Sequence, residues 1–301
     1  MSVRVRCAIV AIALAVAGCG TSPTEPSGPV ASDSGLQPSL LRQSVILVGA
    51  GDIGWCGSTA TRATAALLDG IDGIVFTAGD NAYLSGTEAQ FRDCYAPTRG
   101  RHRARTRPSP GNHDYETPRA LPYFTYFGAN AGPIGLGYYS YDAGAWHIIS
   151  LNSVDPAGGR SAQVRWLRQE LTRTPTGCSL AYWHNPLFSS GPNGGDARMR
   201  DIWRVLYEFG VDVVVNGDDH FYERFAPQNP DGRPDPFGIR QFIVGTGGAP
   251  LYGVRNILPN SEIRGSTFGV LKLTLHADSY EWEFVPIPGE SFRDLGGGQC
   301  H

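Results

Sequence analysis

Residues 74–83 read IVFTAGDNAY, an apolar run that stops abruptly at Gly79 and Asp80. A short run that is almost wholly apolar is typical of a strand buried on both faces of a parallel sheet. A second run of this kind covers residues 45–48 and is soon followed by Asp52. Two buried strands with an acidic residue just beyond each end predict a sheet whose edge carries carboxylates.

The rest of the chain alternates between helix-like and strand-like patterns. Helical spacing of apolar residues appears at residues 59–68, 161–171 and 201–209, and a short helix is expected at 88–95. Further strands are predicted at residues 138–141, 146–151, 179–183, 211–215 and 239–244. Residues 270–275 and 280–285 alternate around a turn and predict a hairpin. Together these patterns predict an α/β fold with some antiparallel strands.

The composition limits the class of protein. The chain has 301 residues with 39 glycines and 22 prolines, which excludes long helices and coiled coils. With 41% hydrophobic residues and a formal net charge of −3, neither wholesale disorder nor general nucleic-acid binding is expected. We expect one globular domain over residues 40–301, preceded by a flexible tether rich in Pro, Ser, Gly and Thr at 19–39.

The first residues have the pattern of an export signal, which we place at residues 1–18. Arg4 and Arg6 precede an apolar stretch that is too short to span a bilayer. The stretch ends in VAGC at residues 16–19, which resembles the lipobox of bacterial lipoproteins and implies cleavage before Cys19 and lipidation of its thiol. An ordinary secretory signal is the alternative. Both predict an extracytoplasmic protein, either secreted or anchored by lipid to the cell membrane.

Four cysteines would remain in the exported protein: Cys56, Cys94, Cys178 and Cys300. An even number of cysteines in an oxidising compartment predicts two disulfides, with three possible connectivities. We favour Cys56–Cys94 together with Cys178–Cys300, because Cys56 and Cys94 each follow an early strand and loop. The sequence has no CxxC pair, which argues against a zinc site built from thiolates.

Polar residues that can bind metals recur just after the predicted strands. They are Asp52, Asp80, Asn112, His113, Asp114, His184, Asp218, Asp219 and His220. Ligands in open α/β sheets bind outside the carboxyl ends of the strands, so these side chains are expected to meet at one edge. Carboxylates, an amide and imidazoles together suit a hard or borderline metal ion.

These motifs, in this order, are similar to those of the calcineurin-like metallophosphoesterases. The matching stretches are GDIG at 51–54, GDNAY at 79–83, GNHD at 111–114, WH at 183–184 and GDDHFYER at 217–224. Many family members have a histidine where this chain has Gly54, and Tyr83 is typical of the purple acid phosphatase-like branch, here of bacterial secreted type. The resemblance implies a four-layer αββα sandwich with mixed sheets and a phosphoric ester hydrolase.

The resemblance also implies a role for each site residue. The first metal ion would be held by Asp52, Asp80, Tyr83 and His220, and the second by Asp80 as a bridge with Asn112 and His184. We add Asp218 as a candidate ligand of the second ion. His113 would not be a ligand but a catalytic residue that faces the substrate phosphate. The phenolate of Tyr83 would favour Fe(III), with Fe, Zn or Mn as the second ion, and plain packing of Tyr83 is the alternative. A metal-bound hydroxide would attack phosphorus.

The chain departs from the family pattern at Asp218, where a histidine usually binds the second metal. Three arrangements stay open: Asp218 binds through its own oxygen, it binds through a water, or the second site is weak. Direct binding would make the site harder and better suited to Mn, Mg or Fe(II) than to Zn. Purple acid phosphatases also have histidines some way after the ligand matched by His184, where this chain has PNG at 192–194.

Arginines alternate along one segment, at Arg99, Arg101, Arg103, Arg105 and Arg107. In an extended segment this spacing places all five on one side, where they could attract an anionic ester or polymer. The alternative, which we favour, is a solvated charged loop.

The leading hypothesis is metal-dependent hydrolysis of phosphate esters by a dinuclear centre. The alternative, suggested by Asp218, is a metal- or phosphate-binding surface protein with weak or vestigial catalysis. The expected partners are a phosphate-ester substrate and, through Cys19, the membrane; no specific nucleic acid is expected, and the chain should be a monomer. The motifs describe the metals and not the pocket, so monoester, diester, nucleotide and phospholipid substrates all stay open.

Overall fold

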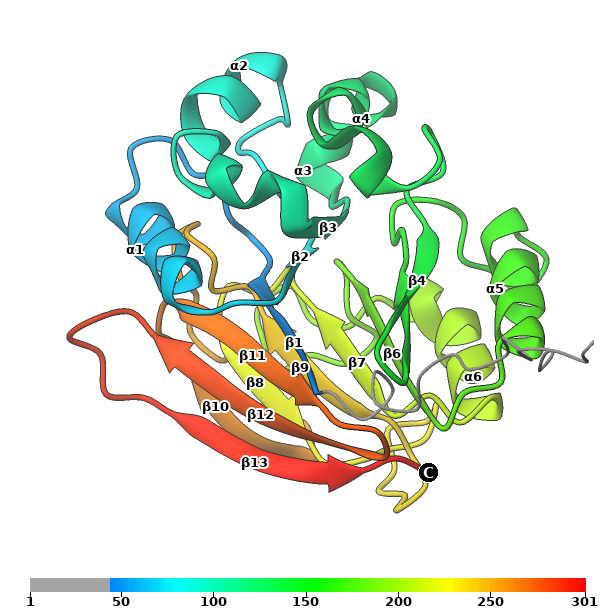
Figure 1. Ribbon diagram of the computed structural model, residues 1–301. Helices are drawn as coiled ribbons and strands as arrows, with labels where there is room; N and C mark the ends of the chain where they lie inside the picture. The colour runs from blue at the N-terminus through cyan, green and yellow to red at the C-terminus, as the bar shows by residue number, and fades with distance from the viewer. Residues whose placement is uncertain (1–43) are drawn as a thin grey trace, which may run out of the picture. The chain divides into compact units, whose positions relative to one another are not determined.

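Two mixed β-sheets packed face to face form the centre of the protein (Figure 1). A computed structural model describes residues 44–301, so the predicted signal peptide, Cys19 and the tether lie outside the described residues. The first sheet contains β1 (Val45–Ala50), β2 (Ile74–Ala78), β3 (Thr106–Ser109), β11 (Gly269–Leu275), β12 (Ser279–Pro286) and β13 (Asp294–Gln299). Its strands lie in the order β13-β12-β11-β1-β2-β3.

The second sheet has the strand order β10-β8-β9-β7-β6-β5-β4. Its members are β4 (Tyr139–Ala143), β5 (Trp146–Ser150), β6 (Cys178–Trp183), β7 (Val213–Asn216), β8 (Tyr222–Phe225), β9 (Arg240–Val244) and β10 (Ser261–Gly265). Strands β1, β2 and β3 run parallel in the first sheet, and β5, β6, β7 and β9 run parallel in the second. Each sheet therefore delivers several carboxyl strand ends to one edge, where a site can form.

Helices supply the outer layers of the predicted αββα sandwich, which is confirmed. The longer helices are α1 (Thr59–Leu67), α5 (Ala162–Arg173) and α6 (Arg200–Glu208); the shorter ones are α2 (Glu88–Gln90), α3 (Asn112–Tyr115) and α4 (Leu121–Phe127). Helix α1 packs on β11, whereas α5 and α6 pack on the outer face of the second sheet. Short 3₁₀ or π turns complete the helical elements: η2 (Leu68–Gly70), η3 (Phe91–Tyr95), η4 (Arg99–Arg105), η5 (Pro118–Ala120), η6 (Gly128–Ala131) and η7 (Ala197–Met199).

The main hydrophobic core lies between the two sheets. Phe76 of β2 faces Tyr182 of β6, with ring centroids 5.7 Å apart, and both side chains are fully buried. On the far side of the second sheet, Leu167 of α5 and Trp203 of α6 are buried against the strands. Burying one side chain of this size contributes about 1.5–3 kcal/mol, so the two cores hold the strand ends rigidly. Among residues 44–301, none of the helices combines the length and apolar character that a bilayer crossing requires.

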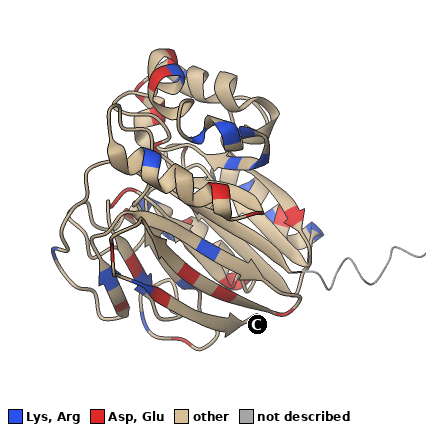
Figure 2. Ribbon diagram, turned by 60° about the vertical axis from the view of Figure 1, so that its left-hand side comes forward, with Lys and Arg blue, Asp and Glu red and all other residues tan. Residues whose placement is uncertain are grey.

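The one-sided strip of arginines is wrong, and the solvated loop that we favoured for this segment does not form either. Residues 99–105 form the 3₁₀-helix η4 instead of an extended segment, and the side chains therefore point in different directions. Arg99 is buried, Arg101 pairs with Asp69 at 2.6 Å, and Arg105 donates to carbonyl oxygens near the end of α1. These arginines stabilise the fold locally, and Figure 2 shows basic and acidic residues interspersed over the ribbon.

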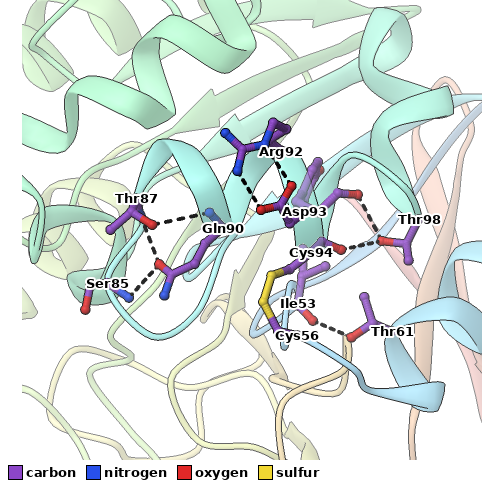
Figure 3. The surroundings of a disulfide bond; sticks show 11 residues. Ile53, Cys56, Thr61, Ser85, Thr87, Gln90, Arg92, Asp93, Cys94 and Thr98 are labelled. Atoms are coloured by element: carbon purple, nitrogen blue, oxygen red, sulfur yellow. Dashed lines mark hydrogen bonds and ion pairs between the residues drawn. A yellow bond between two sulfur atoms is a disulfide. The ribbon is translucent and has the colours of Figure 1, made fainter.

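Both disulfides favoured from the sequence are present. Cys56, in the loop after β1, pairs with Cys94 of η3 (Figure 3), and Cys178 of β6 pairs with Cys300. The second bridge spans 122 positions of sequence and attaches the segment after β13 to the second sheet. Cross-links between distant positions remove conformational freedom from the unfolded chain, more so for long loops.

An ion pair next to the Cys178–Cys300 bridge should make stability depend on pH. The backbone N–H of His301 and its Nδ1 lie 2.9 and 2.8 Å from Oδ1 of the buried Asp212. The hydrogen bond to Asp212 raises the pKa of His301 above its ordinary value of 6.5, although partial burial alone would lower it.

We expect His301→Gln to lower the free energy of unfolding by roughly 0.5 kcal/mol near pH 5.5, a small value because the imidazole is partly exposed. A raised pKa means that this stabilisation is complete below the unfolded pKa and is lost as the pH rises through the folded pKa. The difference between variant and parent should therefore shrink by about pH 9. Urea unfolding at both pH values measures it, and a difference independent of pH would contradict the ion pair.

Candidate metal centre

The predicted site residues come from loops at the carboxyl ends of five strands. Asp52 follows β1, Asp80 follows β2, His184 follows β6 and His220 follows β7. Asn112 and His113 begin α3, just beyond β3. Loops from both sheets thus meet at one edge of the sandwich.

The first group of side chains is centred on the phenol of Tyr83. Its Oη lies 2.7 Å from Oδ1 of Asp52, 2.9 Å from Oδ2 of Asp80 and 3.2 Å from Nε2 of His220. His220 Nε2 also lies 3.1 Å from Asp52 Oδ1, while its Nδ1 is held at 2.7 Å by the carbonyl of Pro250. These four side chains present oxygen and nitrogen atoms to one small volume.

The second group is centred on His184, which is fully buried. Its Nδ1 lies 2.8 Å from the carbonyl oxygen of Ala78, which fixes the ring and leaves Nε2 directed at the carboxylates. Nε2 lies 3.2 Å from Oδ2 of Asp80 and 3.5 Å from Oδ1 of Asp218. Asp80 therefore contacts both groups, in the position expected of a bridging ligand.

The donor set fits a metal ion. Nε2 of His184 is a buried nitrogen that makes no hydrogen bond with any residue in the described part of the chain. Ligand atoms of Asp52, Asp80 and His184 all lie within 4.8 Å of one another. Buried carboxylates that converge without a cation are costly, so a bound cation would stabilise this arrangement.

The ionisation of these groups reflects the crowded negative charge. Burial raises the pKa of Asp218 to about 6, with the Asp52 and Asp80 carboxylates adding to the effect. Burial alone would lower the pKa of His184, but Asp80, Asp52 and Asp218 raise it well above its usual value. In the absence of a metal ion, protons on His184 and Asp218 therefore reduce the negative charge of the site, and a bound metal ion can take their place.

Backbone strain is concentrated at the same place. Asp52, Asp80 and Asp218 all have positive φ angles, of 59°, 49° and 73°. The left-handed region is unfavourable for residues other than glycine, although aspartate tolerates it better than most. The surrounding packing therefore holds three acidic residues in conformations that aim their carboxylates at one point.

Glycines before the site residues permit the close approach of the loops. A Cβ on Gly79, whose φ is +80°, would lie 2.4 Å from Cβ of His184. A Cβ on Gly111 would lie 2.2 Å from Oδ1 of Asp80. Only glycine fits at these two positions, which explains part of the high glycine content.

His113 lies beside the two groups without joining either. Its backbone N–H donates to Oδ1 of Asp80 at 2.9 Å, its Nδ1 contacts the carbonyl of Leu84, and its ring packs on Tyr83 with centroids 4.6 Å apart. The next residue, Asp114, is buried and accepts from the N–H of Gly111 at 2.9 Å, which fixes the turn.

A cavity of about 730 Å³ opens over the centre. Its lining includes the predicted residues Asp80, Asn112, His113, Asp218 and His220. Figure 1 shows the loops after β1, β2, β3 and β7 on the same side of the sandwich as α3. The structure thus brings every predicted site residue to one location, while their roles as ligands stay a prediction.

Sequence reasoning missed two residues that hold the site. Nδ2 of Asn185 donates to Oδ1 of Asp218 at 2.8 Å, and Oδ1 of Asn185 accepts from Ser153 at 2.9 Å. Tyr252 stacks on His220, with ring centroids 4.1 Å apart and planes 10° apart. Asn185 directly follows His184 and could have been noticed, whereas Tyr252 comes from a distant loop without any local signal.

Comparisons with known proteins agree with this geometry. Residues 47–222 match the family model described as Calcineurin-like phosphoesterase. Purple acid phosphatase 21 of Arabidopsis thaliana is 34% identical over 142 residues, which cover 44% of this chain and 32% of the plant protein. An uncharacterised protein of Mycobacterium tuberculosis is 32% identical over 147 residues, covering 40% of this chain and 28% of that protein.

A solved structure has a similar fold. The purple acid phosphatase PPD1 from yellow lupin (Lupinus luteus) seeds superposes with a TM-score of 0.75 at 20% identity, covering 86% of this chain and 54% of the lupin chain. At that identity the likeness concerns the fold. The matched segments span about a third of the length of the curated relatives named above.

Proposed function

Because the chain belongs to the calcineurin-like phosphoesterase family, in its purple acid phosphatase-like branch, we propose that it hydrolyses phosphate esters with two bound metal ions. The observation that best supports this is the convergence of Asp52, Asp80 and Asp218 on the buried Nε2 of His184, which makes no hydrogen bond within residues 44–301. A cavity large enough for a small ester lies directly over these groups.

The contacts divide the ligands between the two ions, except for Asn112, which is assigned because it lines the cavity beside Asp80. We assign Asp52, Asp80, Tyr83 and His220 to the first ion, and Asp80, Asn112, His184 and Asp218 to the second. When bound, such a metal pair activates a water for attack on phosphorus and neutralises charge on the phosphoryl oxygens. The protein's part is to hold the ligands in place, through Ala78 at His184, Pro250 at His220 and Asn185 at Asp218.

His113 is the residue proposed to act on the substrate itself. It lines the cavity and is held by Leu84 at Nδ1, so Nε2, which lies 3.8 Å from Oδ2 of Asp80, is the atom proposed to face a substrate oxygen. From there it can stabilise charge on the phosphoryl group or give a proton to the leaving oxygen. Residues 192–194 supply no histidine to assist it.

Tyr83 favours Fe(III) at the first position in this proposal. A phenolate is a hard ligand, and its oxygen contacts both Asp52 and Asp80. Fe, Zn or Mn would occupy the second position.

The test is reconstitution with iron, zinc and manganese, followed by assays on a chromogenic phosphomonoester and a phosphodiester. We expect two ions per chain and turnover of at least one ester. A visible charge-transfer band with iron would support Tyr83 as a ligand, and a colourless iron-loaded protein would contradict it.

A second candidate function is a metal- or phosphate-binding surface protein with weak catalysis. It is favoured by Asp218, since the family usually has a histidine there. The same reconstitution separates the two functions: one tightly bound ion without turnover supports the binding protein, and two ions with turnover reject it.

We also propose an extracytoplasmic location, secreted or lipid-anchored at Cys19. The bridges Cys56–Cys94 and Cys178–Cys300 support it, because disulfides persist in oxidising compartments. Fractionation of cells that express the full chain tests it, and recovery with reduced cysteines in the cytoplasm would reject it.

A further inference from the structure

The cavity over the metal centre is lined by one arginine side chain, within residues 44–301, that has no role in the proposed hydrolysis. Arg198 lines it together with Asp80, Asn112 and His113, and no other Lys or Arg from residues 44–301 does so. Its side chain is 66% exposed, so the guanidinium is accessible to a ligand. Within the described residues it hydrogen-bonds only to Asp196, which lines the same cavity.

Asp196 holds the guanidinium in one orientation. Its carboxylate accepts from Nε of Arg198 at 2.9 Å and from Nη2 at 2.6 Å, and also from the backbone N–H of Arg198 at 2.9 Å. A guanidinium has five N–H groups, so this pairing leaves both hydrogens of Nη1 and one of Nη2 free. That free edge matches a carboxylate or phosphate through two parallel hydrogen bonds.

The loop that leads to Arg198 is attached by hydrogen bonds to residues 218–220 of the candidate metal centre. The buried Asp219, between Asp218 and His220, accepts from the backbone N–H groups of Asn193 at 3.0 Å and Gly194 at 3.2 Å. Nδ2 of Asn193 donates to the carbonyl of Asp218 at 2.8 Å. Arg198, in η7, therefore follows a loop whose position relative to the metal ligands is set by hydrogen bonds.

The charge of Arg198 also interacts with the charge of the proposed metal ligand Asp218. The hydrogen bonds to Asp196, with a smaller contribution from the Asp218 carboxylate, raise the pKa of Arg198. The guanidinium thus lies within electrostatic reach of the metal ligands, without contacting them. A phosphate held at the centre would leave Arg198 beside the remainder of the substrate molecule.

We propose that Arg198 is a specificity-determining residue that binds a second anionic group of the substrate, a carboxylate or second phosphate on the leaving group. The inference rests on the proposed hydrolysis and narrows its substrate class to esters with two anionic groups. The reacting phosphate is left to the metal ligands and His113.

The test compares three esters of primary alcohols on the metal-loaded full chain. Glycerol 3-phosphate has a neutral leaving group, 3-phosphoglycerate has a carboxylate, and propane-1,3-diol bisphosphate has a second phosphate. In Arg198→Gln, we expect the ratio of kcat/KM for either ester with a second anionic group to that for glycerol 3-phosphate to fall about tenfold, mainly through KM, which corresponds to about 1.4 kcal/mol. Arg198→Lys should restore the ratio part of the way to the value of the parent, because lysine keeps the positive charge but cannot form the two parallel hydrogen bonds of a guanidinium.

The matched control is Arg200→Gln, which removes an arginine two positions away that binds Pro230 and Asp231 outside the cavity. Its ratio should equal that of the parent. A ratio that Arg198→Gln leaves unchanged would overturn the inference while the hydrolase proposal stands. If the parent hydrolyses none of the esters, the hydrolase proposal fails, and calorimetry of phosphonoacetate against methylphosphonate still tests Arg198: an equal loss of affinity for both overturns its role.

Discussion

Replacing Asp80 with asparagine should lower kcat/KM for a chromogenic phosphomonoester by about 10³-fold, the scale of losing a group that stabilises the transition state. Bound metal should fall from two ions per chain towards one, as measured by elemental analysis. Asn keeps the size of the side chain and removes its charge, so the fold should survive, which circular dichroism checks.

The physical reason is that Asp80 contacts every part of the centre. Its Oδ2 lies 2.9 Å from Tyr83 Oη and 3.2 Å from His184 Nε2, and its Oδ1 accepts from the backbone of His113 at 2.9 Å. Loss of its charge weakens both metal sites and the hold on His113 together. Asp52 also joins the two groups, because its Oδ2 accepts from the backbone N–H of Asp218 at 3.0 Å.

The matched control is Asp93→Asn, at an exposed residue that pairs with Arg92 at 2.7 Å and does not line the cavity. It should leave kcat/KM and metal content unchanged. A loss of less than tenfold in Asp80→Asn, with two ions still bound, would reject the assigned centre.

The strand ends of the site could be predicted because local signals carry them. The apolar run at 74–78, followed by Gly79 and Asp80, predicts both the buried strand and the turn that presents the carboxylate to the site. The same holds for β1 with Asp52. In these loops the sequence pattern and the tertiary contacts agree, because a tight turn next to a buried strand is a local property.

Other elements could not be predicted, because tertiary contacts override their local patterns. Strand β13 contains Gly296–Gly298, which disfavours a strand, yet it forms because these glycines lie against Trp282 and Tyr280 of β12. The arginine segment failed for a related reason. Spacing by two predicts one face only if the backbone is extended, and η4 is helical.

The side chains that orient the proposed ligands could not be predicted from the sequence either. Tyr252 reaches His220 across the fold, and Asn185 has meaning only once Asp218 is seen beside it. Side chains that orient a ligand need only one correct contact, and nothing in their local spacing reveals it. This is why the ligands could be inferred and their neighbours could not.

Asp218 stands where the family resemblance implies a histidine, and replacing it should have the next largest effect. Its Oδ1 lies 3.5 Å from Nε2 of His184 and accepts from Asn185 at 2.8 Å, so its carboxylate is directed at the position proposed for the second ion. Asp218→Asn keeps that hydrogen bond and removes the charge. We expect kcat/KM to fall about 10²-fold and the affinity for the second ion to fall at least tenfold, within the range for removing a group that stabilises developing charge.

The identity of the second ion should change with the ligand. An oxygen donor favours Mn, Mg or Fe(II), whereas imidazole suits Zn, so Asp218→His should raise the ratio of Zn to Mn affinity about tenfold or more. Competitive titration against a metal-binding dye measures this ratio without any assay of activity. If Asp218 binds through a water, or if the second site is weak, Asp218→Asn should change the affinity of the second ion less than about threefold, about 0.7 kcal/mol. That outcome would contradict direct coordination of the second ion by Asp218, and the ion count and turnover would then decide between the hydrolase and the binding protein.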